Sequence, residues 1–80
     1  MSIDETQYWE SIATVIRMEM AGRKMTQAEL AGQVGVGREA VNDYLNGKRK
    51  MPFPTFVRIA DALGFTPAGL AAAAEARIGL

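Results

Sequence analysis

The chain has 80 residues, zero formal net charge, no cysteine and no histidine, and 49% of its residues are hydrophobic. A chain of this length is expected to form one small domain over residues 1–80, held together by its apolar core, because disulfides and the usual zinc ligands are excluded. No apolar run approaches the roughly 20 residues that a membrane span needs, and the acidic N-terminus is unlike a signal or transit peptide.

The first predicted helix is the longest. It is expected to begin at Ser2, with Glu5 completing a capping box, and to end near Gly22. Apolar residues at a spacing of three and four predict its buried face, which comprises Trp9, Ile12, Ala13, Ile16 and Met20. Tyr8 and Val15 lie off that face.

The middle of the chain is predicted to form two short helices joined by a tight turn. Thr26 and Glu29 form a second capping box, and the helix that they open extends to about Gln33. Gly35 is expected to end it in the left-handed conformation, in which a side chain would strain the backbone. The next helix is predicted over residues 38–45.

The stretch GVGREA, residues 35–40, also fits the letter pattern of a dinucleotide-binding glycine loop. That fingerprint requires a strand before the first glycine and a strand-helix-strand unit around it. The preceding residues TQAELAGQV carry a helix start and helical spacing instead. The glycines are therefore interpreted as turn residues, and no cofactor is predicted.

The last third of the chain is predicted to form a loop and two further helices. NGKRKMPFP reads as the loop, because Asn-Gly and two prolines interrupt helices. A fourth helix takes Pro54 in its first turn and stops at Gly64, and its expected buried residues are Phe56, Val57, Ala60 and Leu63. A fifth helix is capped by Thr66, begins at Pro67 and continues through an Ala-rich segment.

The run TQAELAGQVGVGREAVNDYLNGKRKMP resembles the lambda-repressor-like helix-turn-helix family, which includes phage repressors, Cro proteins and many bacterial regulators. The matching features are Thr26-Gln27, Leu30-Ala31, Gly35, Val41, Asn46-Gly47 and Pro52. RIADALGFTPAGL is similar to the family's fourth helix and the start of its fifth. The resemblance covers residues 12–70 and implies a compact all-α domain of five helices, whose third helix enters the major groove of DNA.

Outward positions near the start of the third helix read base edges in this family, and the resemblance assigns them to Arg38, Glu39, Asn42 and Asp43. Arg38 can hold guanine through two hydrogen bonds, Asn42 can pair with adenine, and either carboxylate can accept from cytosine N4. The alternative is that this side of the helix is an ordinary solvated face.

Phosphate contacts are expected from residues around the third helix. Gln27 lies at a helix N-terminus, which favours anions. The other candidates are Arg23, Lys24, Asn46, Lys48, Arg49 and Lys50. The run KRK would by itself be a solvated loop, and its place directly after the third helix favours DNA contact. The chain is neutral, yet residues 23–58 carry seven basic and three acidic side chains, so it can present one positive face.

Two positions depart from the family pattern. Tyr44 stands where an aliphatic residue is usual, so its hydroxyl needs a partner or water if it is buried. The family often pairs an arginine of the first helix with a glutamate at the end of the third. Here the corresponding positions are interpreted as Met20 and Leu45, and an apolar contact is expected to replace that ion pair.

The sequence therefore predicts a double-stranded DNA-binding transcriptional regulator in the cytosol of a bacterium, encoded by the host or by a phage, and most simply a repressor that occupies an operator. A homodimer is expected to use the fifth helix or the exposed side of the first, and binding as a monomer stays open. The alternative is an antitoxin that neutralises a toxin and regulates its own promoter. Neither an enzyme, a metal site nor a small-molecule ligand is predicted, because no nucleophile or acid-base set is evident.

Overall fold

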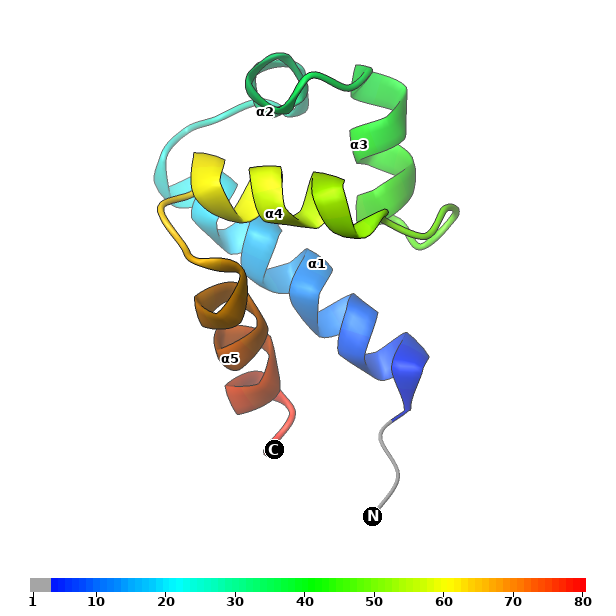
Figure 1. Cartoon of the computed structure of the whole chain (residues 1–80), viewed down its shortest axis with the longest axis vertical. Coiled ribbons are helices and arrows are strands. Elements are labelled where there is room, and N and C mark those ends of the chain that lie inside the picture. The colour runs from blue at the N-terminus through cyan, green and yellow to red at the C-terminus, as the bar shows by residue number, and fades with distance from the viewer. Residues whose placement is uncertain (1–3) are drawn as a thin grey trace.

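Helices account for the secondary structure of residues 4–80, the part of the chain that the computed structural model describes. They are α1 (Glu5–Gly22), α2 (Gln27–Val34), α3 (Arg38–Leu45), α4 (Phe53–Ala62) and α5 (Pro67–Arg77). Figure 1 places α2 and the start of α3 at one end of the molecule, and the end of α5 at the other. The predicted all-α class and the five helices are confirmed.

The N-terminal cap of α1 differs from the prediction. Asp4 is the cap, and its Oδ1 accepts from the backbone N–H groups of Thr6 at 2.9 Å and Gln7 at 3.4 Å. A carboxylate here also faces the positive end of the helix dipole. Glu5 is therefore the first helical residue, so the predicted capping box is wrong; the expected cap, Ser2, lies outside the described residues.

The buried face of α1 is rotated from the predicted one. Val15 is only 7% exposed, whereas Trp9 is 37% exposed and lies at the edge of the core. The reason is that α5 packs along α1. Ser11, one turn before Val15 on the same face, donates its hydroxyl to the backbone carbonyl of Ala74 in α5 at 2.7 Å.

The capping box that opens α2 is confirmed. Thr26 Oγ1 accepts from the Glu29 backbone N–H, and Glu29 Oε1 accepts from the Thr26 backbone N–H, both at 3.0 Å. These hydrogen bonds to Thr26 lower the pKa of the Glu29 carboxyl group. The helix runs one residue beyond Gln33, and Gly35 follows it in the expected left-handed conformation, with φ of 76°.

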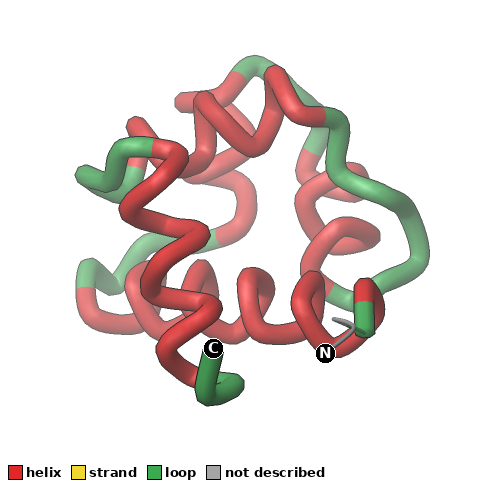
Figure 2. Tube along the Cα trace, turned by 60° about the horizontal axis from the view of Figure 1, so that its bottom comes forward, coloured by secondary structure: helices red, strands yellow, loops and turns green. Residues whose placement is uncertain are grey.

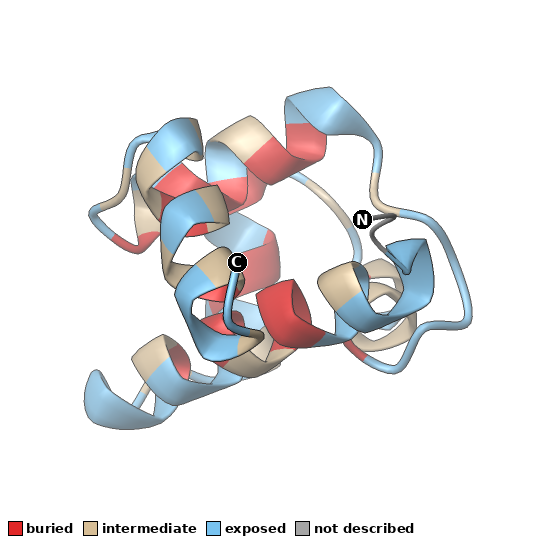
Figure 3. Cartoon of the chain, turned by 90° about the horizontal axis from the view of Figure 1, so that it is seen from below, coloured by how far each residue is buried: buried red, intermediate tan, exposed pale blue. Residues whose placement is uncertain are grey.

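The core lies where the five helices meet, and Figure 3 shows the buried residues on the sides of the helices that face one another. The side chains with the least exposure are Ile12, Ile16, Leu30, Val41, Ile59, Leu63 and Leu70. Val57, expected in the core, is only partly buried, and Ile59 is buried in its place. Because α4 begins at Phe53, its inward face follows residues 56, 59, 60 and 63, and Val57 falls at the edge.

Short loops connect the helices (Figure 2), and the longest, residues 46–52, joins α3 to α4. Within residues 4–80, no single helix combines the length and the apolar character of a membrane span. Helices α4 and α5 meet those criteria only together, and the pair is bent by 89°.

Candidate nucleic-acid interface

Helix α3 presents one apolar and one polar side. Val41 and Leu45 are buried against the core. The four predicted base-reading residues lie on the other side: Arg38 and Glu39 are exposed, and Asn42 and Asp43 are half-buried. Residues 38 and 42, like 39 and 43, are neighbours on the helix surface, so the four side chains form two adjacent rows.

A chain of side-chain hydrogen bonds crosses this surface and joins three helices. Asn42 Nδ2 donates to Gln27 Oε1 in α2 at 3.2 Å. Asn42 Oδ1 accepts from Asn46 Nδ2 at 3.1 Å, directly after α3. Asn46 Oδ1 in turn accepts from Arg17 Nη2 in α1 at 2.9 Å. The Asn42 amide is thus held from both sides, and keeps one N–H and one lone pair for another partner.

Arg17 belongs to this series of hydrogen-bonded side chains, but the sequence analysis did not assign it to the site. The sequence did contain a signal for Arg17, because it is the only basic residue before Arg23. The link between α1 and the end of α3 was expected to be apolar. Met20 and Leu45 are indeed buried, but Arg17 and Asn46 add a polar contact between the same two elements.

Gln27 is the first residue of α2, at the positive end of that helix. Its side-chain oxygen accepts from Asn42, so its amide nitrogen is the group that remains to donate to a phosphate. The structure therefore brings together Gln27, Asn42 and Asn46, three residues that the sequence predicted for the site.

The loop after α3 carries the predicted cations. Arg49 Nη2 lies 3.3 Å from Asp43 Oδ2, and its guanidinium carbon lies 6.0 Å from the centre of the Tyr44 ring. Lys50 Nζ lies 3.4 Å from Glu5 Oε1, but the two side chains are 89% and 67% exposed, so this pair contributes little. Lys48 is exposed, and its backbone N–H donates to the Asp43 carbonyl at 2.9 Å.

Tyr44, the residue that departs from the family pattern, is half-buried beside Arg49. Its hydroxyl is therefore not enclosed in the core. Within the described residues, every buried side-chain nitrogen and oxygen has a hydrogen-bond partner.

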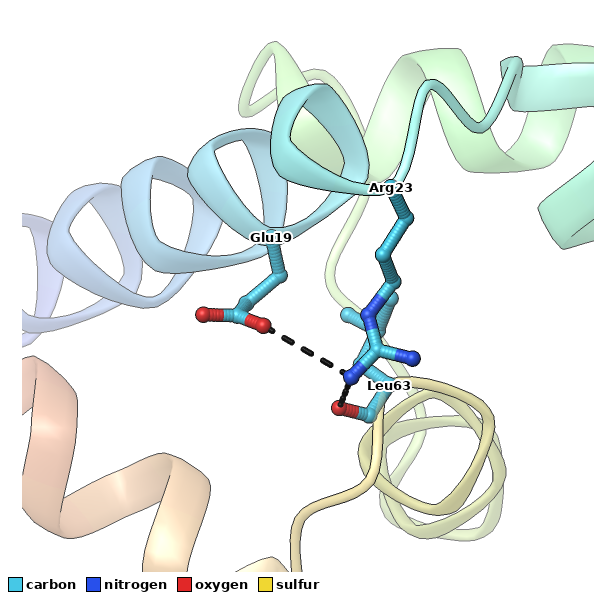
Figure 4. Close-up of polar contacts among 3 residues, drawn as sticks. All are labelled: Glu19, Arg23 and Leu63. Carbon is cyan, nitrogen blue, oxygen red and sulfur yellow. Dashed lines mark hydrogen bonds and ion pairs between the residues drawn. The ribbon is translucent and has the colours of Figure 1, made fainter.

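Arg23 and Lys24 are placed differently from the other phosphate candidates. Arg23 Nη2 donates to the Leu63 carbonyl at the end of α4 and lies 3.7 Å from Glu19 Oε1 (Figure 4). Its guanidinium is thus engaged in holding α4 to α1. Lys24 is exposed in a left-handed backbone conformation, with φ of 53°. The structure does not join either residue to the hydrogen-bonded chain around Asn42, and their contact with phosphate stays a prediction.

Comparison with protein families gives one match. A family model for helix-turn-helix domains of the lambda-repressor-like, Cro type matches residues 16–70, which include all of α2, α3 and α4. The comparisons with curated proteins and with solved structures found no significant match. Because the matched segment covers more than half of the chain and contains the two helices and the turn described above, this protein belongs to the lambda-repressor-like family of DNA-binding helix-turn-helix regulators.

Proposed function

We propose that this protein is a transcriptional repressor that recognises an operator in double-stranded DNA by placing α3 in the major groove. The observation that carries the proposal is the outward face of α3, on which Asn42 is held between Gln27 and Asn46 beside the exposed Arg38. An amide fixed in this way loses little rotational freedom when it binds a base.

The four residues of α3 have separable roles in this proposal. Arg38 donates to guanine O6 and N7, and Glu39 accepts from cytosine N4. Asn42 uses its remaining N–H and lone pair for adenine N7 and N6. Asp43 is paired with Arg49, so it reads a base only when Arg49 moves to a phosphate.

The residues that bind phosphate in this proposal surround the outward face of α3. Gln27 offers its amide nitrogen and the N-terminus of α2, while Asn46, Lys48, Arg49 and Lys50 follow α3 along the strand. The Lys50–Glu5 ion pair is exposed and weak, and the Arg49 side chain is itself 55% exposed, so both cations can exchange a carboxylate for a phosphate at small cost. Occupying an operator that overlaps a promoter excludes RNA polymerase, and such repression requires no additional surface of the protein.

Selection of bound sites from random duplex DNA tests the proposal directly. The full chain is expected to enrich a defined motif at low ionic strength, with a guanine and an adenine among the strongly selected bases. Affinity for that motif should exceed affinity for unrelated duplex by about 10³-fold or more. Enrichment of no motif, together with no binding to any duplex at low salt, would exclude DNA recognition by α3.

A further inference from the structure

Asp43, Tyr44 and Arg49 form a cluster of contacts at the end of α3, which we call the α3-end cluster. Arg49 Nη2 lies 3.3 Å from Asp43 Oδ2, and the Arg49 guanidinium carbon lies 6.0 Å from the centre of the Tyr44 ring. The guanidinium therefore has a carboxylate and an aromatic ring as neighbours at the same time, and both attract a cation.

The loop after α3 folds back onto the helix and keeps the Arg49 backbone close to Asp43. The Lys48 backbone N–H donates to the Asp43 carbonyl at 2.9 Å, and the Gly47 backbone N–H donates to the Tyr44 carbonyl at 3.4 Å. Because these hydrogen bonds involve only backbone atoms, they are kept when the Arg49 side chain turns away from Asp43. Arg49 can therefore exchange partners by rotation of its side chain alone.

The cost of an unpaired Asp43 carboxylate differs between the free chain and a DNA complex. In the free chain the side chains of Arg49 and Asp43 are 55% and 29% exposed, so water can replace either partner. In the major groove the same carboxylate would lie between phosphates and lose water, and an unsatisfied charged acceptor is destabilising there. Asp43 would then need a donor, which is either Arg49 or an amino group of a base.

We propose that the base opposite Asp43 decides whether Arg49 contacts a phosphate. This coupling rests on the proposed placement of α3 in the major groove. Where the base is cytosine, its N4 amino group donates to Asp43, and Arg49 turns to a phosphate. Where the base is thymine, it presents the acceptor O4 to Asp43, so Arg49 stays with the carboxylate. One base pair thus changes a base contact and a phosphate contact together, which increases discrimination beyond that of the base contact alone.

Tyr44 is the positioning residue of the α3-end cluster. Its ring is half-buried and belongs to α3, so it keeps the Arg49 side chain beside the end of the helix whichever partner Arg49 takes. The attraction comes from the face of the ring, and an aliphatic side chain at this position would not supply it. The hydroxyl group is not needed for this role.

The dependence of affinity on salt measures the coupling. Binding of the full chain is titrated at several salt concentrations on the selected operator, and on the same duplex with the C·G pair opposite Asp43 replaced by T·A. That pair is identified as the position at which selection with Asp43→Ala loses its preference. The slope of log affinity against log salt should be steeper on the operator by about 0.9, the effect of one additional phosphate contact.

Two substitutions in the same row of α3 separate the coupling from a base contact alone. Asp43→Ala frees Arg49 on every sequence, so the two duplexes should give equal slopes, and affinity for unrelated duplex should rise. Glu39→Ala is the matched control, because Glu39 lies one turn earlier and takes part in none of the ion pairs among the described residues. This variant should relax the preference at one other base pair and keep the difference in slope.

Two substitutions at Tyr44 test its positioning role. Tyr44→Phe keeps the ring and should retain the difference in slope, whereas Tyr44→Leu removes the ring and should reduce it. Nuclear magnetic resonance of the free chain supplies a measurement without DNA, since the Arg49 side-chain protons should lose their ring-current shift only in Tyr44→Leu. Circular dichroism verifies that both variants are folded. Equal behaviour of the two variants in both measurements would exclude a role for the ring.

Failure of the coupling and failure of DNA recognition give different results. Equal slopes on the two duplexes, with tight and selective binding to the operator, would overturn the coupling and leave the proposed function intact. Selection with Asp43→Ala that returns the same motif as the original chain would have the same meaning. No binding to any duplex at low salt would overturn the function on which the coupling rests, and the coupling with it.

Discussion

Arg38 and Lys48 are both exposed cations next to α3, but their positions favour different interactions. Arg38 is the first residue of α3 and shares its outward row with Asn42. Lys48 follows the helix end and comes directly after Gly47, whose φ is 74°. We therefore propose that Arg38 contacts base edges when α3 lies in the groove, and that Lys48 contacts the sugar-phosphate backbone.

Replacing these two residues separates the two kinds of contact. Arg38→Ala should cost about 1–3 kcal/mol on the operator and relax the preference at one base pair. Lys48→Ala should weaken all sequences alike and reduce the slope of log affinity against log salt by about 0.9. Both are measured by titration of matched and mismatched duplexes at several salt concentrations. A loss of specificity in Lys48→Ala but not in Arg38→Ala would reverse the assigned roles.

Arg17 is predicted to act on DNA recognition through Asn46 and Asn42, without touching a base itself. Arg17→Ala and Asn46→Ala each interrupt the chain of hydrogen bonds that holds the Asn42 amide. In a double-mutant cycle on operator binding, the two should couple by about 0.5–1.5 kcal/mol. For Arg17→Ala, specificity at the adenine that Asn42 is proposed to contact should fall more than affinity for unrelated DNA. Strict additivity would show that the two residues act independently, and Arg77→Ala, which removes an exposed arginine from α5, should leave that specificity unchanged.

The turn between α2 and α3 sets the angle at which α3 is presented. Gly35 has φ of 76°, and the Ala31 carbonyl accepts from both the Gly35 and Val36 backbone N–H groups. A Cβ added at Gly35 would meet no described atom within 4 Å. The requirement for glycine is therefore conformational and not steric.

Two glycine substitutions with opposite expected effects test this reading. Gly35→Ala should lower the free energy of unfolding by about 1–2 kcal/mol, because a side chain disfavours the left-handed conformation. Gly32→Ala is the control, since Gly32 lies within α2 and also has open space around it. That substitution should raise the free energy of unfolding by about 0.5–1 kcal/mol. Both values come from denaturant unfolding, and equal destabilisation by the two variants would contradict the conformational explanation.

For the whole molecule, the pairing of α1 with α5 brings together residues far apart in the chain. Tyr8 donates its hydroxyl to Glu75 Oε2 at 2.7 Å across 67 positions, and Ser11 donates to the Ala74 carbonyl across 63. At the C-terminal end of α1, Arg23 donates to the Leu63 carbonyl and so holds the end of α4. These contacts hold α1, α4 and α5 together around the core, against which α3 packs.

The Tyr8 contact predicts a dependence of stability on pH. The hydrogen bond to Glu75, then burial, then the charge of Glu75 raise the pKa of Tyr8 above its ordinary value of 10.0. The folded state therefore holds this proton more tightly, so its stabilisation is complete below pH 10 and is lost as the pH rises through the higher folded pKa. Tyr8→Phe should be less stable than the original chain at pH 9, and the difference should shrink at pH 11 in urea unfolding. A difference that is constant over this range would exclude the linkage.

The helix ends and the turn around α2 could be predicted from the sequence, because capping and turn residues act on backbone groups within one helical turn. The Thr26–Glu29 capping box and the left-handed Gly35 each depend on backbone groups at most four residues away, and both were predicted correctly. The same holds for the bounds of α3 and for the face on which Arg38 and Asn42 lie. Composition and spacing thus determined the helices, the turn and the polar side of α3.

Only the tertiary structure decided which residues far apart in sequence meet. Val15 is buried and Trp9 is partly exposed because α5 covers one side of α1, an arrangement that the spacing within α1 cannot encode. Arg17 reaches Asn46 across 29 positions, whereas Arg23, similar in the sequence, reaches Leu63 across 40. Long side chains bond whichever polar group the packing brings near, so their roles follow from how the helices are arranged and not from local pattern.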